Sequence, residues 1–262
     1  AATSLPVNAT NRSQNLNQVF IGMFRPDRNS KPRWFGNLKR YQLIKEGATV
    51  RLADTRGMEA VNSLTGFLTP CAVSYWTRDS NNCWFDKGVT PSPLSECNPL
   101  SPDAYSDTPD GSFVEKGGAA QILREGNRVF AAGATPDQAI NRSMVTMGVN
   151  ALGAAAFVPF TASASGLDAK LVDWVRGVDV NDEKRTGVLT TTRPSIHGDV
   201  IHSRPQPVNY GGTDPANPVV SVYYGSNDGT LRSVDARTGV ENWSFVPPEF
   251  FSRLSRIYDN TT

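Results

Sequence analysis

Three cysteines are the first candidates for chemistry, because thiols can cross-link a chain or bind zinc. Cys71, Cys83 and Cys97 lie in one stretch rich in Pro, Ser and Asn. Zinc needs four ligands, usually with a close pair of Cys, and this stretch has neither a Cys-x-x-Cys pair nor a nearby His. We therefore favour a disulfide plus one further thiol over three free thiols, because loop cysteines of exported proteins usually pair. The spacing does not select which two pair.

The two histidines are the next candidates, because imidazole serves as a metal ligand and as a general base. His197 and His202 are five residues apart in a segment that we predict to be extended. Residues five apart in a strand face opposite sides, so the two rings could share a metal only across a bulge. We expect both to be structural. Within the same string, Asp199 and Arg204 are expected to pair or to hold the turn at Pro205, a contact worth at most about 1 kcal/mol if it is partly exposed.

The sequence lacks the motifs of several other chemistries. No Ser lies in a Gly-x-Ser-x-Gly elbow, and no phosphate-binding Gly-rich loop follows a predicted strand. The net charge of +1 gives no basic field for a nucleic acid. No run of about 18 apolar residues is present that could span a membrane. Hydrolase, nucleotide-binding, nucleic-acid-binding and membrane-spanning proteins therefore receive no support.

The elements that would position these residues are mainly strands. The 22 Gly and 18 Pro indicate a globular chain rich in turns. Residues 18–26 and 32–43 alternate between apolar and polar around the charged turn at 27–31, which predicts a β-hairpin. Val50 to Asp54 predicts a short additional strand.

Residues 64–165 are predicted as a loop-rich insertion with short helices. Four aromatic residues in its first part are our candidates for a surface contact, with the alternative that they fold back onto the domain: Tyr75, Trp76, Trp84 and Phe85. Val114 to Glu125 predicts a helix, which two glycines near its start weaken by about 1 kcal/mol each.

A stronger helix is predicted over residues 166–179. Its apolar residues form one stripe at helical spacing: Leu167, Leu171, Trp174 and Val175. We expect Gly177 to end the helix and the stripe to pack against a sheet, with a partner-binding helix as the alternative.

Residues 195–262 show the clearest strand pattern. Strands are expected over 198–210, 219–226, 230–236 and 240–246. The last three are joined by tight turns, at Asn227 to Gly229 and at Thr238 with Gly239. Such a meander is the repeating unit of a β-propeller, in which Trp243 would fill the space between adjacent blades.

The string YYGSNDGTLRSVDARTGVENWSF, residues 223–245, resembles the blade repeat of pyrroloquinoline-quinone proteins. Two flanking strings are more specific: RPSIHGDVIHSRP at 193–205 and FVPPEFF at 245–251. Together they look like the C-terminal domain of the PilC/PilY family of type IV pilus tip adhesins and biogenesis factors. The strings NQVFIGMFRPD, RWFGNLKRYQL and SDTPDGSFVEKGGAA agree, so the resemblance covers most of residues 17–258.

The resemblance implies a fold that is mainly β, with residues 1–262 forming the N-terminal portion of a quinoprotein-like β-propeller with helical and loop insertions. We expect the chain to be a fragment whose ring is completed elsewhere in a longer protein. The family's calcium loop has no clear counterpart. The nearest candidate comprises Asp179, Asn181, Asp182 and Glu183, but the central Gly of an EF-like loop is missing and two cations follow at once. The alternative is a solvated turn that caps the preceding helix.

The implied function is non-enzymatic. Such a protein is exported to the pilus tip, the cell surface or the outer membrane, where it supports pilus assembly, retraction, twitching motility and adhesion. Its expected partners are minor pilins and host or abiotic surfaces. No cofactor is expected in this chain, although calcium could bind elsewhere in the parent protein. The alternatives are a fragment of a quinone-dependent dehydrogenase and a structural propeller scaffold of the outer membrane.

Overall fold

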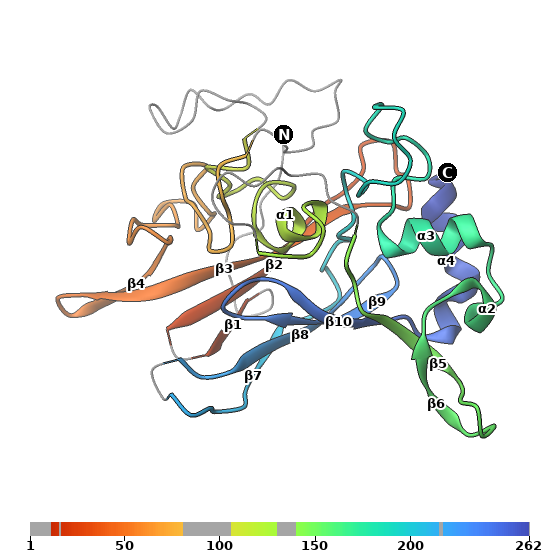
Figure 1. The fold of residues 1–262 in the computed structure, drawn as a ribbon. Helices are drawn as coiled ribbons and strands as arrows, with labels where there is room; N and C mark the ends of the chain where they lie inside the picture. The colour runs from red at the N-terminus through yellow and green to blue at the C-terminus, as the bar shows by residue number, and fades with distance from the viewer. Residues whose placement is uncertain (1–11, 16, 81–105, 130–139, 215–216, 262) are drawn as a thin grey trace.

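The computed structural model describes residues 12–15, 17–80, 106–129, 140–214 and 217–261, and all structural statements concern these ranges. The chain is mainly β, with two sheets and several short helices (Figure 1). Neither sheet closes into a barrel or a ring within the described ranges.

The first sheet is an antiparallel meander in the order β1-β2-β3-β4. Its strands are β1 (Arg12–Asn15), β2 (Gln18–Arg25), β3 (Phe35–Glu46) and β4 (Thr49–Ala53). The predicted hairpin and short strand are confirmed, because β2 pairs with β3 along its whole length and β3 continues into β4. β2 is buried on both faces from Val19 to Met23, so its register with β3 follows from the hairpin turn at residues 27–31.

The second sheet has six strands in the order β6-β5-β10-β9-β8-β7. Its strands are β5 (Met144–Val149), β6 (Ala155–Pro159), β7 (Gln206–Asn209), β8 (Val220–Ser226), β9 (Thr230–Asp235) and β10 (Glu241–Phe245). The meander of β8, β9 and β10 and both of its tight turns are confirmed. Gly229 and Gly239 have φ of 85° and 76°, in the left-handed region that such turns require.

Two expectations about this sheet are wrong. Residues 198–205 are not a strand, because the chain there forms a loop and pairing with β8 begins only at Gln206. The region 64–165 is not only loops and helices, because it contributes the β5–β6 hairpin, whose first strand runs parallel to β10.

The two sheets pack face to face around one apolar cluster. Phe20 and Leu38 of the first sheet meet Val222, Tyr224 and Val234 of the second. Beside this cluster, β3 passes close to the loop before β7, where a Cβ on Gly36 would lie 1.8 Å from the carbonyl oxygen of Gly198. The edge strands β1 and β7 also lie against one another (Figure 1).

The opposite face of the first sheet is covered by the loops that follow β4, whereas α1 (Gly118–Arg124) contributes Ala119 to the cluster between the sheets. Val19, Ile21 and Tyr41 on this face are buried against Leu68 and Val114 of those loops. The predicted helix over Val114–Glu125 is confirmed in type but starts later, because Gly117 and Gly118 adopt φ of 60° and 58°.

The remaining helices gather at one end of the second sheet. They are α2 (Ala162–Ser165), α3 (Ala169–Arg176), the 3₁₀ turn η2 (Pro248–Phe250) and α4 (Phe251–Asp259). Asp168 caps the start of α3 through its side chain, and Gly177 ends the helix with φ of 108°, as expected. The apolar stripe of α3 is buried, but it packs against α4 as well as against the end of the sheet.

Candidate interaction surface

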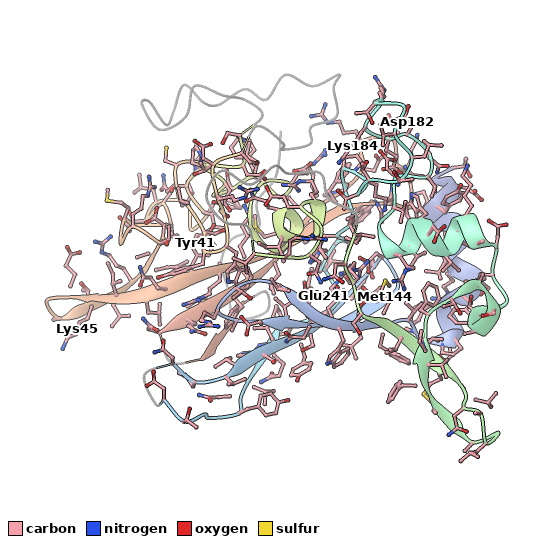
Figure 2. The ribbon with its side chains drawn as sticks, in the orientation of Figure 1. Tyr41, Lys45, Met144, Asp182, Lys184 and Glu241 are labelled. Carbon is pink, nitrogen blue, oxygen red and sulfur yellow. The ribbon has the colours of Figure 1, made fainter. Side chains whose placement is uncertain are left out.

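A buried network of charges joins β9 and β10 to the start of β5. The carboxylate of Glu241 accepts two hydrogen bonds from Arg142, at 2.8 and 3.0 Å, and also pairs with Arg232. Arg232 in turn pairs with Asp228 of the tight turn. All four side chains are buried, and Glu241 lies in the interior of the molecule (Figure 2). Burial opposes ionisation of Glu241, yet the two guanidinium groups hold its pKa below the usual range.

His197 completes this network and is also buried. Its Nε2 lies 2.8 Å from the hydroxyl oxygen of Tyr224, and its Nδ1 lies 2.7 Å from the carbonyl oxygen of Gly198. Burial, assisted by the charge of Arg232, lowers the pKa of His197 to about 4, and burial raises the pKa of Tyr224. Near neutral pH the pair is therefore uncharged.

The physical role of the network is to fix the loop before β7 against the turn between β8 and β9. The backbone N–H of Gly198 donates to the carboxylate of Asp228 at 3.0 Å, and a Cβ at Gly198 would lie 2.5 Å from the backbone nitrogen of Asp228. The segments HGDV (residues 197–200) and NDG (residues 227–229), which are far apart in the sequence, thus pack against each other. The predicted pair of Asp199 with Arg204 is not formed. Asp199 instead accepts a hydrogen bond from the Asn227 side chain at 2.6 Å, while Arg204 is exposed.

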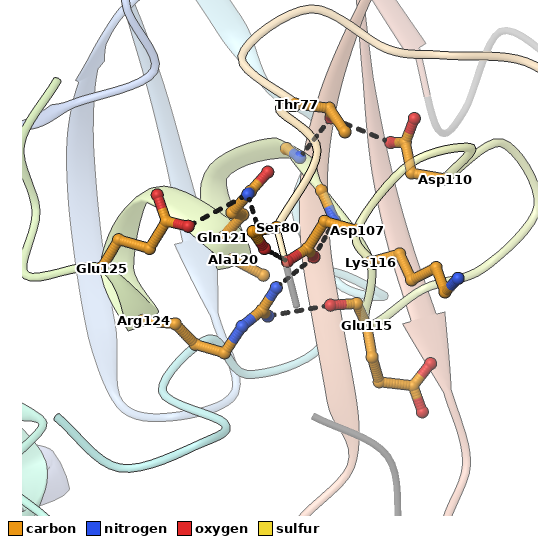
Figure 3. Close-up of polar contacts among 12 residues, drawn as sticks. Thr77, Ser80, Asp107, Asp110, Glu115, Lys116, Ala120, Gln121, Arg124 and Glu125 are labelled. Carbon is orange, nitrogen blue, oxygen red and sulfur yellow. Dashed lines mark hydrogen bonds and ion pairs between the residues drawn. The ribbon is translucent and has the colours of Figure 1, made fainter. Parts of the chain in front are cut away.

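A second polar network surrounds α1. It was not predicted from the sequence. Asp107 pairs with Arg124 of the helix and accepts from the backbone N–H of Gly117 at 2.7 Å (Figure 3). Asp110 receives the Lys39 ammonium of β3 at 3.1 Å. Burial lowers the pKa of Lys39, and the charge of Asp110 opposes that shift. These carboxylates therefore stabilise the packing of the covering loop on the first sheet.

The four predicted calcium ligands are engaged in other contacts. Asp179 is buried and accepts from the backbone N–H groups of Glu183 and Lys184, at 2.7 and 3.0 Å. Glu183 accepts from Arg33 and from Trp174. Asn181 accepts from the Tyr258 hydroxyl. Asp182 bonds the backbone of its own turn in the loop after α3 (Figure 2). Within the described ranges, no group of three or more His, Cys, Asp or Glu side chains is arranged to hold a metal.

The candidate disulfide and contact residues fall only partly within the described ranges. Cys71 is disulfide-bonded, whereas Cys83 and Cys97 lie outside those ranges, so the pairing stays a prediction. Tyr75 and Trp76 are half-buried and contact their own chain. Arg40 lies over the Tyr75 ring, 4.1 Å from its centroid. The indole of Trp76 stacks on Phe20 and donates to the carbonyl oxygen of Ala236. Trp84 and Phe85 lie outside the described ranges, so their contact role stays a prediction.

A different aromatic surface emerges on the outer face of the second sheet. We call it the aromatic face. Its side chains come from five neighbouring strands: Met147, Phe157, Tyr223, Leu231, Trp243 and Phe245. Phe157 meets the Phe245 ring edge-on at 5.5 Å, and Tyr223 lies 5.9 Å from Trp243. Phe157 is 69% exposed and Leu231 40% exposed, which is unusual for apolar side chains gathered on one face. The sequence did not mark this face, because the buried residues next to it in β9 and β10, Thr230, Arg232 and Ser244, are polar.

Two curated proteins match part of the chain. The type IV pilus biogenesis factor PilY1 of Pseudomonas aeruginosa is 32% identical over 109 residues, which cover 34% of this chain and 9% of that protein. The expected resemblance to the PilC/PilY family is confirmed. A PilY1 homolog of Xylella fastidiosa is 32% identical over 118 residues, covering 38% of this chain and 10% of the homolog.

The matched part of the chain thus spans about a tenth of the length of either relative. No protein-family model matches the chain, and no solved structure matches it significantly. Among the described helices, none has both the length and the apolarity needed to cross a bilayer.

Proposed function

We propose that the protein is a non-enzymatic factor of type IV pili that acts at the pilus tip in pilus assembly, retraction and surface attachment. The observation that carries this proposal is the match to two proteins named as PilY1 or its homolog. In this role the protein is exported, and its partners are minor pilins and the host or abiotic surface that the pilus meets.

We further propose that the two sheets are neighbouring blades of a quinoprotein-like β-propeller, completed by other parts of a longer protein. Propeller blades are antiparallel meanders that pack face to face around a common axis. The two meanders here pack through Phe20, Val222 and Tyr224, and their edge strands β1 and β7 lie together. The aromatic face is where the next blade would pack, with Trp243 in the position expected for a residue between blades.

Deletion of the parent gene tests the pilus role. The proposal expects fewer surface pili and reduced twitching, both restored by the intact gene. The alternative function, a quinone-dependent dehydrogenase, predicts a different result. The protein would then reduce an artificial dye only when pyrroloquinoline quinone is added. A structural scaffold of the outer membrane would leave pilus number and twitching unchanged.

A further inference from the structure

A groove of about 1070 Å³ lies on the surface above the buried charge network. Its walls come from four separate segments: the turn between β2 and β3, the loop before β7, the turn between β8 and β9, and the end of the chain from η2 into α4. Because His197, Asp228 and their partners lock the loop to the turn, the groove has a fixed wall rather than a flexible one.

The groove combines an apolar lining with free positive charge. Ile201, Phe250 and Ile257 supply apolar surface, and the first two are 39% and 40% exposed. Lys31 and Arg256 also line it, as does Arg253, whose guanidinium lies 5.6 Å from the centre of the Phe250 ring. Within the described ranges, none of these three cations forms an ion pair.

Negative charge on the described lining comes from Asp199 alone. That carboxylate is buried and already accepts from the Asn227 side chain, so it does not neutralise the cations at the rim. The groove therefore presents about three positive charges around apolar surface. This pattern complements a segment that carries carboxylates and apolar side chains together.

We propose that the groove binds an extended peptide segment of a partner protein in which acidic residues alternate with apolar ones. An extended chain lying in the groove presents its side chains to both walls, so that its apolar residues can contact Phe250 and Ile257 while its carboxylates contact Lys31, Arg253 and Arg256. A nucleic acid fits less well, because the whole chain carries a net charge of only +1. This inference goes beyond the proposed pilus role and does not depend on it.

The test uses the protein and an array of immobilised octapeptides in which Asp or Glu alternates with Leu, Ile, Val or Phe. Matched arrays carry Asn or Gln, or Lys, in place of the acids. The best acidic peptide is then labelled with fluorescein and titrated by anisotropy. We expect its amide counterpart to bind at least about tenfold more weakly, and binding to weaken severalfold between about 50 and about 500 mM NaCl, because salt screens exposed charges.

Two triple variants reverse the same number of positive charges, one set in the groove and one set elsewhere on the surface. K31E/R253E/R256E reverses the three rim cations, and K45E/K170E/R237E reverses three exposed cations elsewhere. The first should lose at least about tenfold in affinity and the second less than about twofold. If the first variant unfolds, K31Q/R253Q/R256Q replaces it. Equal binding of acidic and amide peptides, or full binding by the rim variant, would overturn the proposal. So would binding of phosphatidylglycerol vesicles or single-stranded DNA without binding of any acidic peptide.

Discussion

The Nε2 atom of His197 lies 2.8 Å from the hydroxyl oxygen of Tyr224, and both rings are buried and stacked within 14° of parallel. This contact joins the loop before β7 to the middle of β8. A histidine in a cleft beside a tyrosine could suggest acid–base chemistry. Burial lowers the pKa of His197 and raises the pKa of Tyr224, so both groups are neutral near pH 7 and the contact joins two parts of the fold without a buried charge.

Stability should fall as the pH drops because of His197. Its pKa is lowered from 6.5 to about 4 in the folded protein, so the unfolded state binds more protons between these values. The contribution is complete above about pH 6.5 and is lost progressively as the pH falls toward about 4, by roughly 3 kcal/mol in all. Urea unfolding at pH 7 and pH 4.5 measures it. H197Q should show a smaller difference between the two pH values, and an unchanged difference would contradict this assignment.

Removing one charge from the buried network should cost more than removing a surface ion pair. E241Q leaves Arg142 and Arg232 without their shared carboxylate, and we expect a loss of about 3–5 kcal/mol in the free energy of unfolding. The control E46Q removes the pair with Arg51, in which the Glu46 side chain is 67% exposed, and should cost at most about 1 kcal/mol. Similar losses for both variants, measured by denaturant titration, would show that the network is not a buried unit.

The contact of β3 with the loop before β7, at Gly36, should tolerate no side chain. In G36A the new Cβ would meet the backbone of Gly198 rather than a movable side chain, so we expect a loss of about 3 kcal/mol or more. Gly225 is the matched control in β8, because a Cβ there would find its nearest neighbour at 3.9 Å. G225A should change stability by less than about 1 kcal/mol. A stable G36A variant with an unchanged unfolding midpoint would refute the close approach of β3 to this loop.

Charges placed on the aromatic face should destabilise the longer parent protein more than the isolated chain. F157K and L231K place charges on exposed positions, so each should cost the isolated chain less than about 1 kcal/mol. If another blade covers the face, the same changes in the parent protein bury a charge and should destabilise it by several kcal/mol. V50K, on β4 and 63% exposed, is the control that should be mild in both. Equal and small effects in the parent protein would show that no blade packs there.

Local signals account for the parts of the fold that the sequence predicted correctly. The hairpin of β2 and β3 follows from two strand-forming stretches on either side of a charged turn, and the end of α3 follows from Gly177. The turns between β8 and β10 follow from their glycines. In each case the deciding residues are neighbours along the chain.

The missed elements lacked such a local signal or depended on distant residues. The β5–β6 hairpin lies in a segment with no charged residue between Arg142 and Asp168, so polar alternation could not mark its two faces. The pair of Arg142 with Glu241 joins residues 99 positions apart, which a single sequence does not reveal. The helix α4 could have been predicted, because Leu254, Ile257 and Tyr258 follow helical spacing after the prolines of η2.

The most direct test of the account is a count of surface pili by electron microscopy, with twitching scored in parallel. The strains carry a deletion of the parent gene and are complemented with the intact gene, with the F157K/L231K variant or with the V50K control. We predict that deletion lowers pilus number, that the intact gene and V50K restore it, and that F157K/L231K does not. Normal piliation and twitching in the deletion strain would contradict the proposed function.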